Sequence, residues 1–204
     1  TPSTTTSGIS SEVISQIQAQ GFSTDGIIKV DGGYVVENDI FLSTEGLTKA
    51  MSVGPELRVP DEEQYHTTNL ITALPRTITI AVTGLDAIWT AATDSAVARY
   101  NALNLRLKLQ RVASGAAITV TGADLGGGGV LGQSSGFPDI NGNPPNKITI
   151  NSRPGTFGTN PSVQWLATII AHEVGHTIGF RHTDYANRNY SCGFSFPRNE
   201  GDGG

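Results

Sequence analysis

The chain has 204 residues, a length that accommodates one domain with a smaller appendage and excludes a large multidomain assembly. Hydrophobic residues make up 37% of the chain and charged residues 15%, so it can bury a core and is not a disordered segment. Its net charge of −5 argues against binding to nucleic acid through phosphate contacts.

Charged residues divide the chain into two unequal parts that meet near residue 75. Residues 1–75 hold ten acids and three bases, whereas residues 76–204 hold eight acids and ten bases, so their net charges are −7 and +2. This division predicts two modules of opposite sign. Chance clustering of surface charge would give the same division, so charge by itself leaves both interpretations open.

The first part contains one predicted helix and short predicted strands. Residues 12–20 have apolar side chains at helical spacing, and Gly21 is placed to end the helix. Residues 27–43 predict two short strands around the turn Asp31-Gly32-Gly33. The polar stretch 56–68 predicts an exposed linker.

The second part predicts strands and helices in the order β-α-β-β-β-β-α, which is typical of an α+β domain. The predicted strands are 76–82, 105–112, 117–121, one within VLGQSSGFP after the Gly-rich turn at 126–129, and 147–151, and the first helix is 86–103. Asn160 as N-cap and Pro161 as first helical residue begin the second helix, which Gly179 can end.

The last predicted helix carries the motif HEVGHTIGFRH. His172 and His176 are four residues apart, which puts both imidazoles on one face of a helix, within reach of a single metal ion. Gly179 tolerates positive φ and lets the chain reverse, so that His182 returns as a third ligand. Glu173 is offset by about 100° from His172 and flanks the ion instead of binding it.

This pattern predicts zinc chemistry. Three neutral imidazoles leave a fourth zinc position open, and a water bound there has its pKa lowered to roughly 7. Glu173 would take the proton of that zinc-bound water and later deliver it to the leaving amine. The motif therefore predicts metal-assisted peptide hydrolysis. The alternatives are histidines hydrogen-bonded within a core and a structural metal site, and the second leaves Glu173 without a purpose.

With HEVGHTIGFRHTD, the chain resembles the metzincin metallopeptidases, most nearly the bacterial HEIGH-motif family, with astacins as more distant relatives. The resemblance implies that residues 76–204 form a catalytic domain with a twisted mixed sheet, a backing helix and an active-site helix. Substrate then binds in extended, antiparallel form along an edge strand. By the same resemblance, the zinc ligands are His172, His176 and His182, the catalytic residue is Glu173, and substrate contacts Ser135, Gly136 and Phe137.

The acidic first part also fits this resemblance. VVENDI at 35–40 is similar to the FxGDI stretch of astacin propeptides, in which the Asp occupies the fourth zinc position and displaces the catalytic water. The resemblance maps Asp39 onto that residue, so we interpret residues 1–75 as an inhibitory pro-segment and the chain as a latent zymogen. Opposite net charges favour docking of the two parts. The alternative for Asp39 is a plain turn acid beside a hairpin.

Two solitary residues bear on the C-terminal end of the chain. Metzincins have a Met-containing turn downstream of the third histidine, whereas the only methionine here is Met51, far upstream. Because the chain stops 22 residues after His182, we expect a truncated or cleaved chain. The single Cys192 cannot form an internal disulfide, and the resemblance implies that it is half of a lost one.

Together these features predict a secreted, monomeric zinc endopeptidase, captured with its inhibitory segment and acting on proteins or peptides. The sequence has no apolar run that could span a membrane and no signal-peptide pattern at its N-terminus. The alternative is a non-catalytic zinc module in which Asp39 permanently completes a structural four-ligand site. DINGNP at 139–144 begins like a calcium loop but lacks the Gly at position six and the closing Glu, which favours a surface loop.

Overall fold

A computed structural model describes residues 8–20, 22–50, 66–67 and 69–182 of the chain. Their elements are α1 (Ser11–Ala19), β1 (Ile28–Val30), β2 (Gly33–Val36), β3 (Ile40–Ser43), α2 (Thr44–Ala50), β4 (Arg76–Val82), α3 (Ala87–Ala102), β5 (Leu107–Arg111), β6 (Ile118–Ala123), β7 (Gly132–Ser134), β8 (Lys147–Asn151) and α4 (Val163–Ile178). From Arg76 onward the order is β-α-β-β-β-β-α, so the predicted α+β fold is confirmed. None of the described helices is long and apolar enough to cross a membrane.

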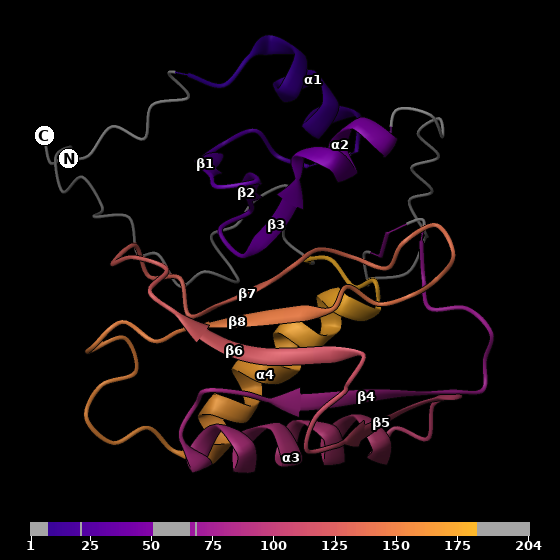
Figure 1. Cartoon of the computed structure of the whole chain (residues 1–204), viewed down its shortest axis with the longest axis vertical. Coiled ribbons are helices and arrows are strands. Elements are labelled where there is room, and N and C mark those ends of the chain that lie inside the picture. The colour runs from indigo at the N-terminus through magenta and orange to yellow at the C-terminus, as the bar shows by residue number, and fades with distance from the viewer. Residues whose placement is uncertain (1–7, 21, 51–65, 68, 183–204) are drawn as a thin grey trace, which may run out of the picture.

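One mixed sheet runs through the described part of the chain, with its strands in the order β1-β2-β3-β7-β8-β6-β4-β5 (Figure 1). The strands β5, β4, β6 and β8 run parallel to one another, and β7 is antiparallel to β8. The strand β3 joins β7 in parallel through a single residue pair, Ile40 with Ser134. The three N-terminal strands therefore extend the sheet beyond β7, the antiparallel strand of the C-terminal part.

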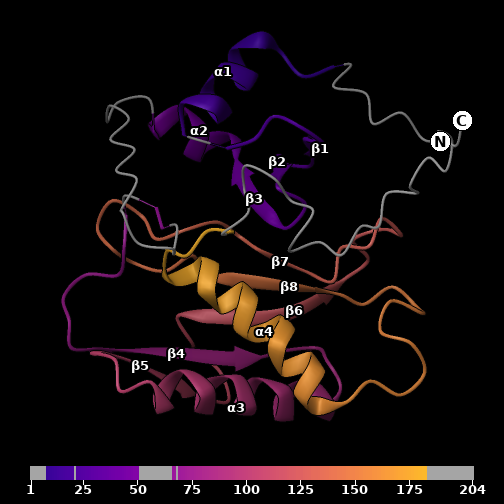
Figure 2. The same ribbon diagram turned by 180° about the vertical axis from the view of Figure 1, so that it is seen from behind.

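The described residues bury two separate hydrophobic clusters. The larger lies between the C-terminal strands and the helices α3 and α4, and Figure 2 shows α4 crossing the sheet in front of β6 and β8. Its fully buried side chains include Ile80, Val120, Ile148, Leu166 and Ile170. The smaller cluster joins α1, α2 and the strands β2 and β3, and the partly buried Phe137 from the C-terminal part packs against it.

Contacts between α3 and α4 fix the helix that carries the histidine motif. The Tyr100 hydroxyl donates to the Ala171 carbonyl at 2.9 Å, and burial raises the pKa of Tyr100 to about 12, so the phenol remains a donor. Arg99 donates to the Gln164 carbonyl at 2.9 Å and to the Thr168 hydroxyl at 3.0 Å. These bonds tie the middle of α4 to its neighbour.

The N-terminal part differs from the prediction. Residues 27–43 form three strands instead of two, and the unpredicted helix α2 follows them. A turn at residues 37–39, with left-handed backbone at Glu37 and Asn38, divides the second predicted strand into β2 and β3. The predicted helix at 12–20 is confirmed as α1, with Ser10 as its N-cap, while Gly21 lies outside the described residues.

Two further expectations about the chain path need correction. The N-cap of α4 is Ser162 and not Asn160, because the Ser162 hydroxyl accepts a hydrogen bond from the Trp165 amide at 3.2 Å. Of the predicted linker at 56–68, only residues 66 and 67 are described, and they are not a free linker. His66 pairs with Phe180, and the Thr67 amide donates to the Gly179 carbonyl at 2.9 Å.

Candidate metal centre

The C-terminal half of α4 places the histidine pair. His172 and His176 lie on consecutive turns, and Gly179 ends the helix in the left-handed conformation with φ of 112°. The Phe180 amide closes the last turn by donating to the Gly175 carbonyl at 2.9 Å. The chain then reverses and brings His182 back to the other two rings, as the spacing of the motif predicts.

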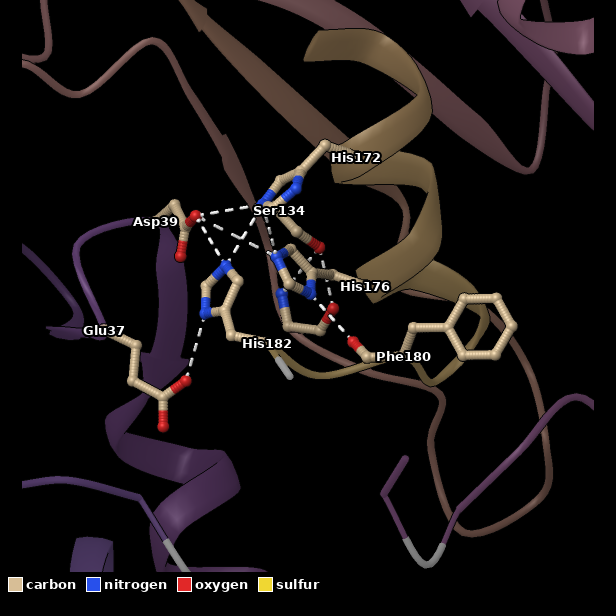
Figure 3. A network of polar contacts seen from close by, with 8 residues as sticks. Glu37, Asp39, Ser134, His172, His176, Phe180 and His182 are labelled. Atoms are coloured by element: carbon tan, nitrogen blue, oxygen red, sulfur yellow. Dashed lines mark hydrogen bonds and ion pairs between the residues drawn. The ribbon is translucent and has the colours of Figure 1, made fainter. Parts of the chain in front are cut away.

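Four side chains converge at this point (Figure 3). The His172 Nε2 atom lies 3.1 Å from the Nε2 atoms of both His176 and His182. Asp39, just before β3, brings its Oδ2 atom within 3.0 Å of the His182 Nε2, 3.2 Å of the His172 Nε2 and 3.9 Å of the His176 Nε2. The predicted metal ligands are thus brought together, one from the N-terminal and three from the C-terminal part.

The hydrogen bonds of His176 and His182 indicate which ring nitrogen of each carries the proton. The His176 Nδ1 atom lies 2.8 Å from the Phe180 carbonyl, and the His182 Nδ1 atom lies 3.2 Å from the Glu37 carboxylate. Both oxygens accept, so each Nδ1 carries the proton and each Nε2 turns a lone pair toward the cluster. Asp39 adds another acceptor, because its Oδ2 atom faces the same Nε2 atoms.

These converging acceptors fit a bound cation. Lone pairs about 3 Å apart repel one another unless a positive charge lies between them. Four ligands at 2.0 to 2.1 Å from a tetrahedral zinc ion are about 3.3 Å from each other, which is near the separations among the described ligand atoms. The chemistry and spacing of the donor set therefore match zinc.

Glu173 lies beside the cluster but outside the set of converging ligand atoms. Its side chain is buried against β7 at Gly132, where a Cβ atom would lie 2.8 Å from the Glu173 Oε1 atom. Burial, and then the charge of Asp39, raise its pKa well above the usual range, while a backbone hydrogen bond from Ser134 opposes the shift. The Oε2 atom is buried and has no hydrogen-bond partner among the described residues.

The predicted substrate strand is in contact with the N-terminal part. Ser135 follows β7 directly, and its amide and hydroxyl both donate to the Lys147 carbonyl of β8, at 3.0 and 2.8 Å. The Ser134 amide, on the other side of β7, donates to the backbone carbonyl of Asp39 at 3.1 Å. The edge of β7 along which an extended peptide is expected to bind is therefore covered by β3 at this point.

Phe137 connects the two parts through its ring. It stacks on Phe22 with ring centroids 5.8 Å apart, and its ring lies edge-to-face with the His176 ring at 5.9 Å. Gly136, with φ of 116°, brings the chain close to β3, since a Cβ atom there would lie 3.3 Å from the Phe41 carbonyl. Both residues thus lie at the contact between the N-terminal and C-terminal parts.

Comparison with known proteins identifies the family. Residues 34–204 match the family model of the dual-action HEIGH metallo-peptidases. The chain belongs to this family. The resemblance to the HEIGH-motif family is therefore confirmed, and the match also includes VENDI with Asp39.

Solved structures similar to this HEIGH metallopeptidase include two of myroilysin. One is 19% identical, covers 55% of this chain and 52% of its own, and has a TM-score of 0.38. The other is 18% identical, covers 58% and 49%, and has a TM-score of 0.40. The chain thus spans about half the length of these structures. No curated protein matches the chain significantly.

Three residues of this HEIGH metallopeptidase site are missed by the sequence reasoning. Glu37 is buried and accepts hydrogen bonds from Arg181 at 2.8 Å and from the His182 Nδ1 at 3.2 Å. Gly132 provides the space that Glu173 occupies. The one signal for Glu37 in the sequence is its position two residues before Asp39, and nothing in the sequence marks Arg181 or Gly132.

The remaining expectations are either unsupported or outside the described residues. The Asp139 carboxylate accepts hydrogen bonds from the Asn141 and Asn143 amides at 2.9 and 2.8 Å, so it closes its own turn, and a calcium site there has no support. Met51 and Cys192 lie outside the described residues, as does the segment that follows His182.

Proposed function

We propose that this metallopeptidase-family chain is a secreted, monomeric zinc endopeptidase of metzincin type in latent form. Residues 1–75 act as the inhibitory pro-segment, residues 76–204 as the catalytic domain, and proteins or peptides are the substrates. The observation that carries the proposal is the convergence of three imidazole nitrogens and the Asp39 oxygen within 4.8 Å of one another. The family match supports the peptidase chemistry.

Each residue of the site has a distinct part in this proposal. His172, His176 and His182 hold the zinc ion, and Asp39 fills the position that the reacting water takes in the active enzyme. Zinc, when bound, supplies the Lewis acid that polarises a peptide carbonyl and acidifies water. Glu173 accepts the proton of the water and delivers it to the leaving amine, and this role is supported by its Oε2 atom, which has no hydrogen-bond partner within the described part of the chain.

The contact between β3 and β7 supports the latent state. Because β3 runs parallel to β7, it lies in the direction opposite to that expected of an antiparallel substrate. The Asp39 carbonyl accepts a hydrogen bond from the Ser134 amide. An extended substrate paired with β7 would need this same backbone donor. Backbone and side chain of Asp39 therefore obstruct the site together.

Replacing Asp39 tests the proposal. We expect Asp39→Ala in the full chain to raise hydrolysis of casein or of a peptide library, because the position opposite Glu173 is then open to water. The control is Asp31→Ala, an exposed acid in the turn between β1 and β2. A chelator should abolish the gained activity. If Asp39→Ala behaves like Asp31→Ala, and the chain trimmed of residues 1–75 is also inactive, the enzyme proposal is wrong.

One observation favours a second candidate function. With Asp39 in place, the four ligands form the closed set that structural zinc sites prefer. A non-catalytic zinc module would bind zinc with the unaltered chain and lose affinity in Asp39→Ala without gaining hydrolysis. The enzyme loses affinity in the same variant but gains hydrolysis.

A further inference from the structure

The three histidines of the cluster are held by different parts of the chain. His176 is oriented from within its own helix end, because its Nδ1 atom donates to the Phe180 carbonyl four residues away. The His172 side chain is 43% exposed. His182 is buried, and its Nδ1 atom donates to Glu37, which lies 145 residues earlier in the sequence. The third histidine is therefore oriented by the N-terminal part.

Glu37 is built into this position by the turn between β2 and β3. Glu37 and Asn38 both have left-handed backbone conformations, with φ of 51° and 70°. Such conformations are uncommon for residues other than glycine and persist where surrounding contacts compensate for them. The turn directs the Glu37 and Asp39 side chains to the same cluster, as Figure 3 shows. Asp39 reaches the Nε2 atom of His182 and Glu37 reaches its Nδ1 atom.

Arg181 completes the contact. Its Nη2 atom donates to the Glu37 Oε1 atom at 2.8 Å, while the Oε2 atom of the same carboxylate faces His182. The guanidinium carbon of Arg181 lies 4.5 Å from the centre of the Phe22 ring, which belongs to the N-terminal part as well. The Glu37 side chain is fully buried. Water therefore cannot solvate the Arg181 charge if the Glu37 charge is removed.

We propose that Glu37 is a positioning residue for the metal site: it fixes His182 in the tautomer that ligates through Nε2, with Arg181 as its counter-charge. The inference rests on the proposed zinc site and adds to it, because the N-terminal part then orients a ligand in addition to obstructing the site. Release of the segment removes the acceptor of the His182 Nδ1 proton, so segment docking and metal affinity are coupled. Outer partners of this kind change metal affinity substantially.

Glu37→Gln tests the role with little change in size. When the amide oxygen accepts from Arg181, the amide nitrogen meets the His182 Nδ1–H, and the two donors favour the tautomer that cannot ligate through Nε2. We expect zinc affinity, measured by competition with a chromogenic chelator, to fall by roughly 10- to 100-fold. The matched control is Glu12→Gln, which alters an exposed acid in the first turn of α1. Equal affinities of the two variants would overturn the inference.

A second measurement uses the unaltered chain, so its result does not depend on whether a substituted protein folds. Nitrogen-15 NMR of the histidine rings should find the His182 Nδ1 protonated and slow to exchange with solvent, both without metal and with zinc. The exposed His172 ring serves as an internal reference that exchanges quickly. A His182 Nδ1 atom without a proton, or one that exchanges as fast as that of His172, would overturn the inference.

These measurements separate failure of the inference from failure of the proposed function. If the unaltered chain binds no zinc, the proposed function is wrong, whereas the metal-free spectra still decide whether Glu37 fixes the His182 tautomer. If the unaltered chain binds zinc and Asp39→Ala changes that affinity while Glu37→Gln does not, only the role of Glu37 is wrong.

Discussion

The N-terminal region, described over residues 8–20 and 22–50, and the C-terminal region, residues 69–182, which includes residues 69–75 of the proposed pro-segment, are stabilised differently. The C-terminal region has two helices of sixteen residues and seventeen buried residues in its cluster. The N-terminal region has helices of nine and seven residues and eight buried residues in its cluster. A core of the second size rarely supports a fold by itself. The smaller region therefore depends on docking to the larger one.

The two regions also contribute different chemistry to the site. The C-terminal region supplies the histidines, Glu173 and Arg181, and the N-terminal region supplies Glu37 and Asp39. Backbone pairing between them is limited to one residue pair of β3 and β7. The side chains at the metal site therefore carry much of the contact. A region held mainly by such contacts can be released without unfolding the region that carries the chemistry.

The largest expected effect separates latency from catalysis. Glu173→Gln, added to Asp39→Ala, should lower peptide hydrolysis by roughly 100-fold or more, because the proton acceptor is lost. Zinc binding should match that of Asp39→Ala, since Glu173 is not among the converging ligand atoms. Hydrolysis rates and zinc content of the two proteins check this. Unchanged hydrolysis in the double variant would assign the proton transfer to another group.

Truncation of one buried side chain in each region tests their unequal stability. Ile170→Ala should lower the free energy of global unfolding by about 2 to 5 kcal/mol, because it leaves a cavity in the larger cluster. Leu47→Ala, in the smaller cluster, should instead increase amide exchange within the N-terminal region and leave the main thermal transition near its original temperature. If both variants lower the temperature of the main thermal transition to a similar extent, the two regions unfold as one.

Gly132→Ala tests how closely β7 packs against the Glu173 side chain of α4. The added Cβ atom would lie 2.8 Å from the Glu173 Oε1 atom, so Glu173 must shift, and we expect a loss of about 1 to 3 kcal/mol in unfolding free energy. Gly128→Ala is the matched control, because a Cβ atom there has no neighbour within 4 Å. Urea denaturation measures both variants. Equal midpoints would show that Glu173 has room to move.

The smallest effects come from the two helix caps. Ser10 caps α1 through the Val13 amide at 3.3 Å, and Ser162 caps α4 through the Trp165 amide at 3.2 Å. Replacement of either serine by alanine should cost about 1 kcal/mol of helix stability. Hydrogen exchange should locate the Ser10→Ala effect in the N-terminal region, and urea denaturation should detect Ser162→Ala globally. The reverse pattern would contradict the unequal stability of the two regions.

The C-terminal region is predicted well from the sequence, and the N-terminal region less so. Periodicity predicts α3 almost to the residue, because this helix buries one regular face against a large core. The turn at residues 37–39 that separates β2 from β3 is missed, because it contains no Gly or Pro. The helix α2 has seven residues, too few for a periodic signal. Short elements stabilised by neighbours leave little trace in the sequence.

By itself, the sequence determined the histidine cluster and the place of Glu173, because HEVGHTIGFRH encodes them through the 3.6-residue period of one helix and the left-handed Gly179. It also singled out Asp39 through a family resemblance. Only the tertiary structure decided that Glu37 contacts His182, that Gly132 makes room for Glu173, and that β3 lies along β7. These contacts join residues far apart in the chain or depend on the absence of a side chain at Gly132. The local spacing of residues predicts neither.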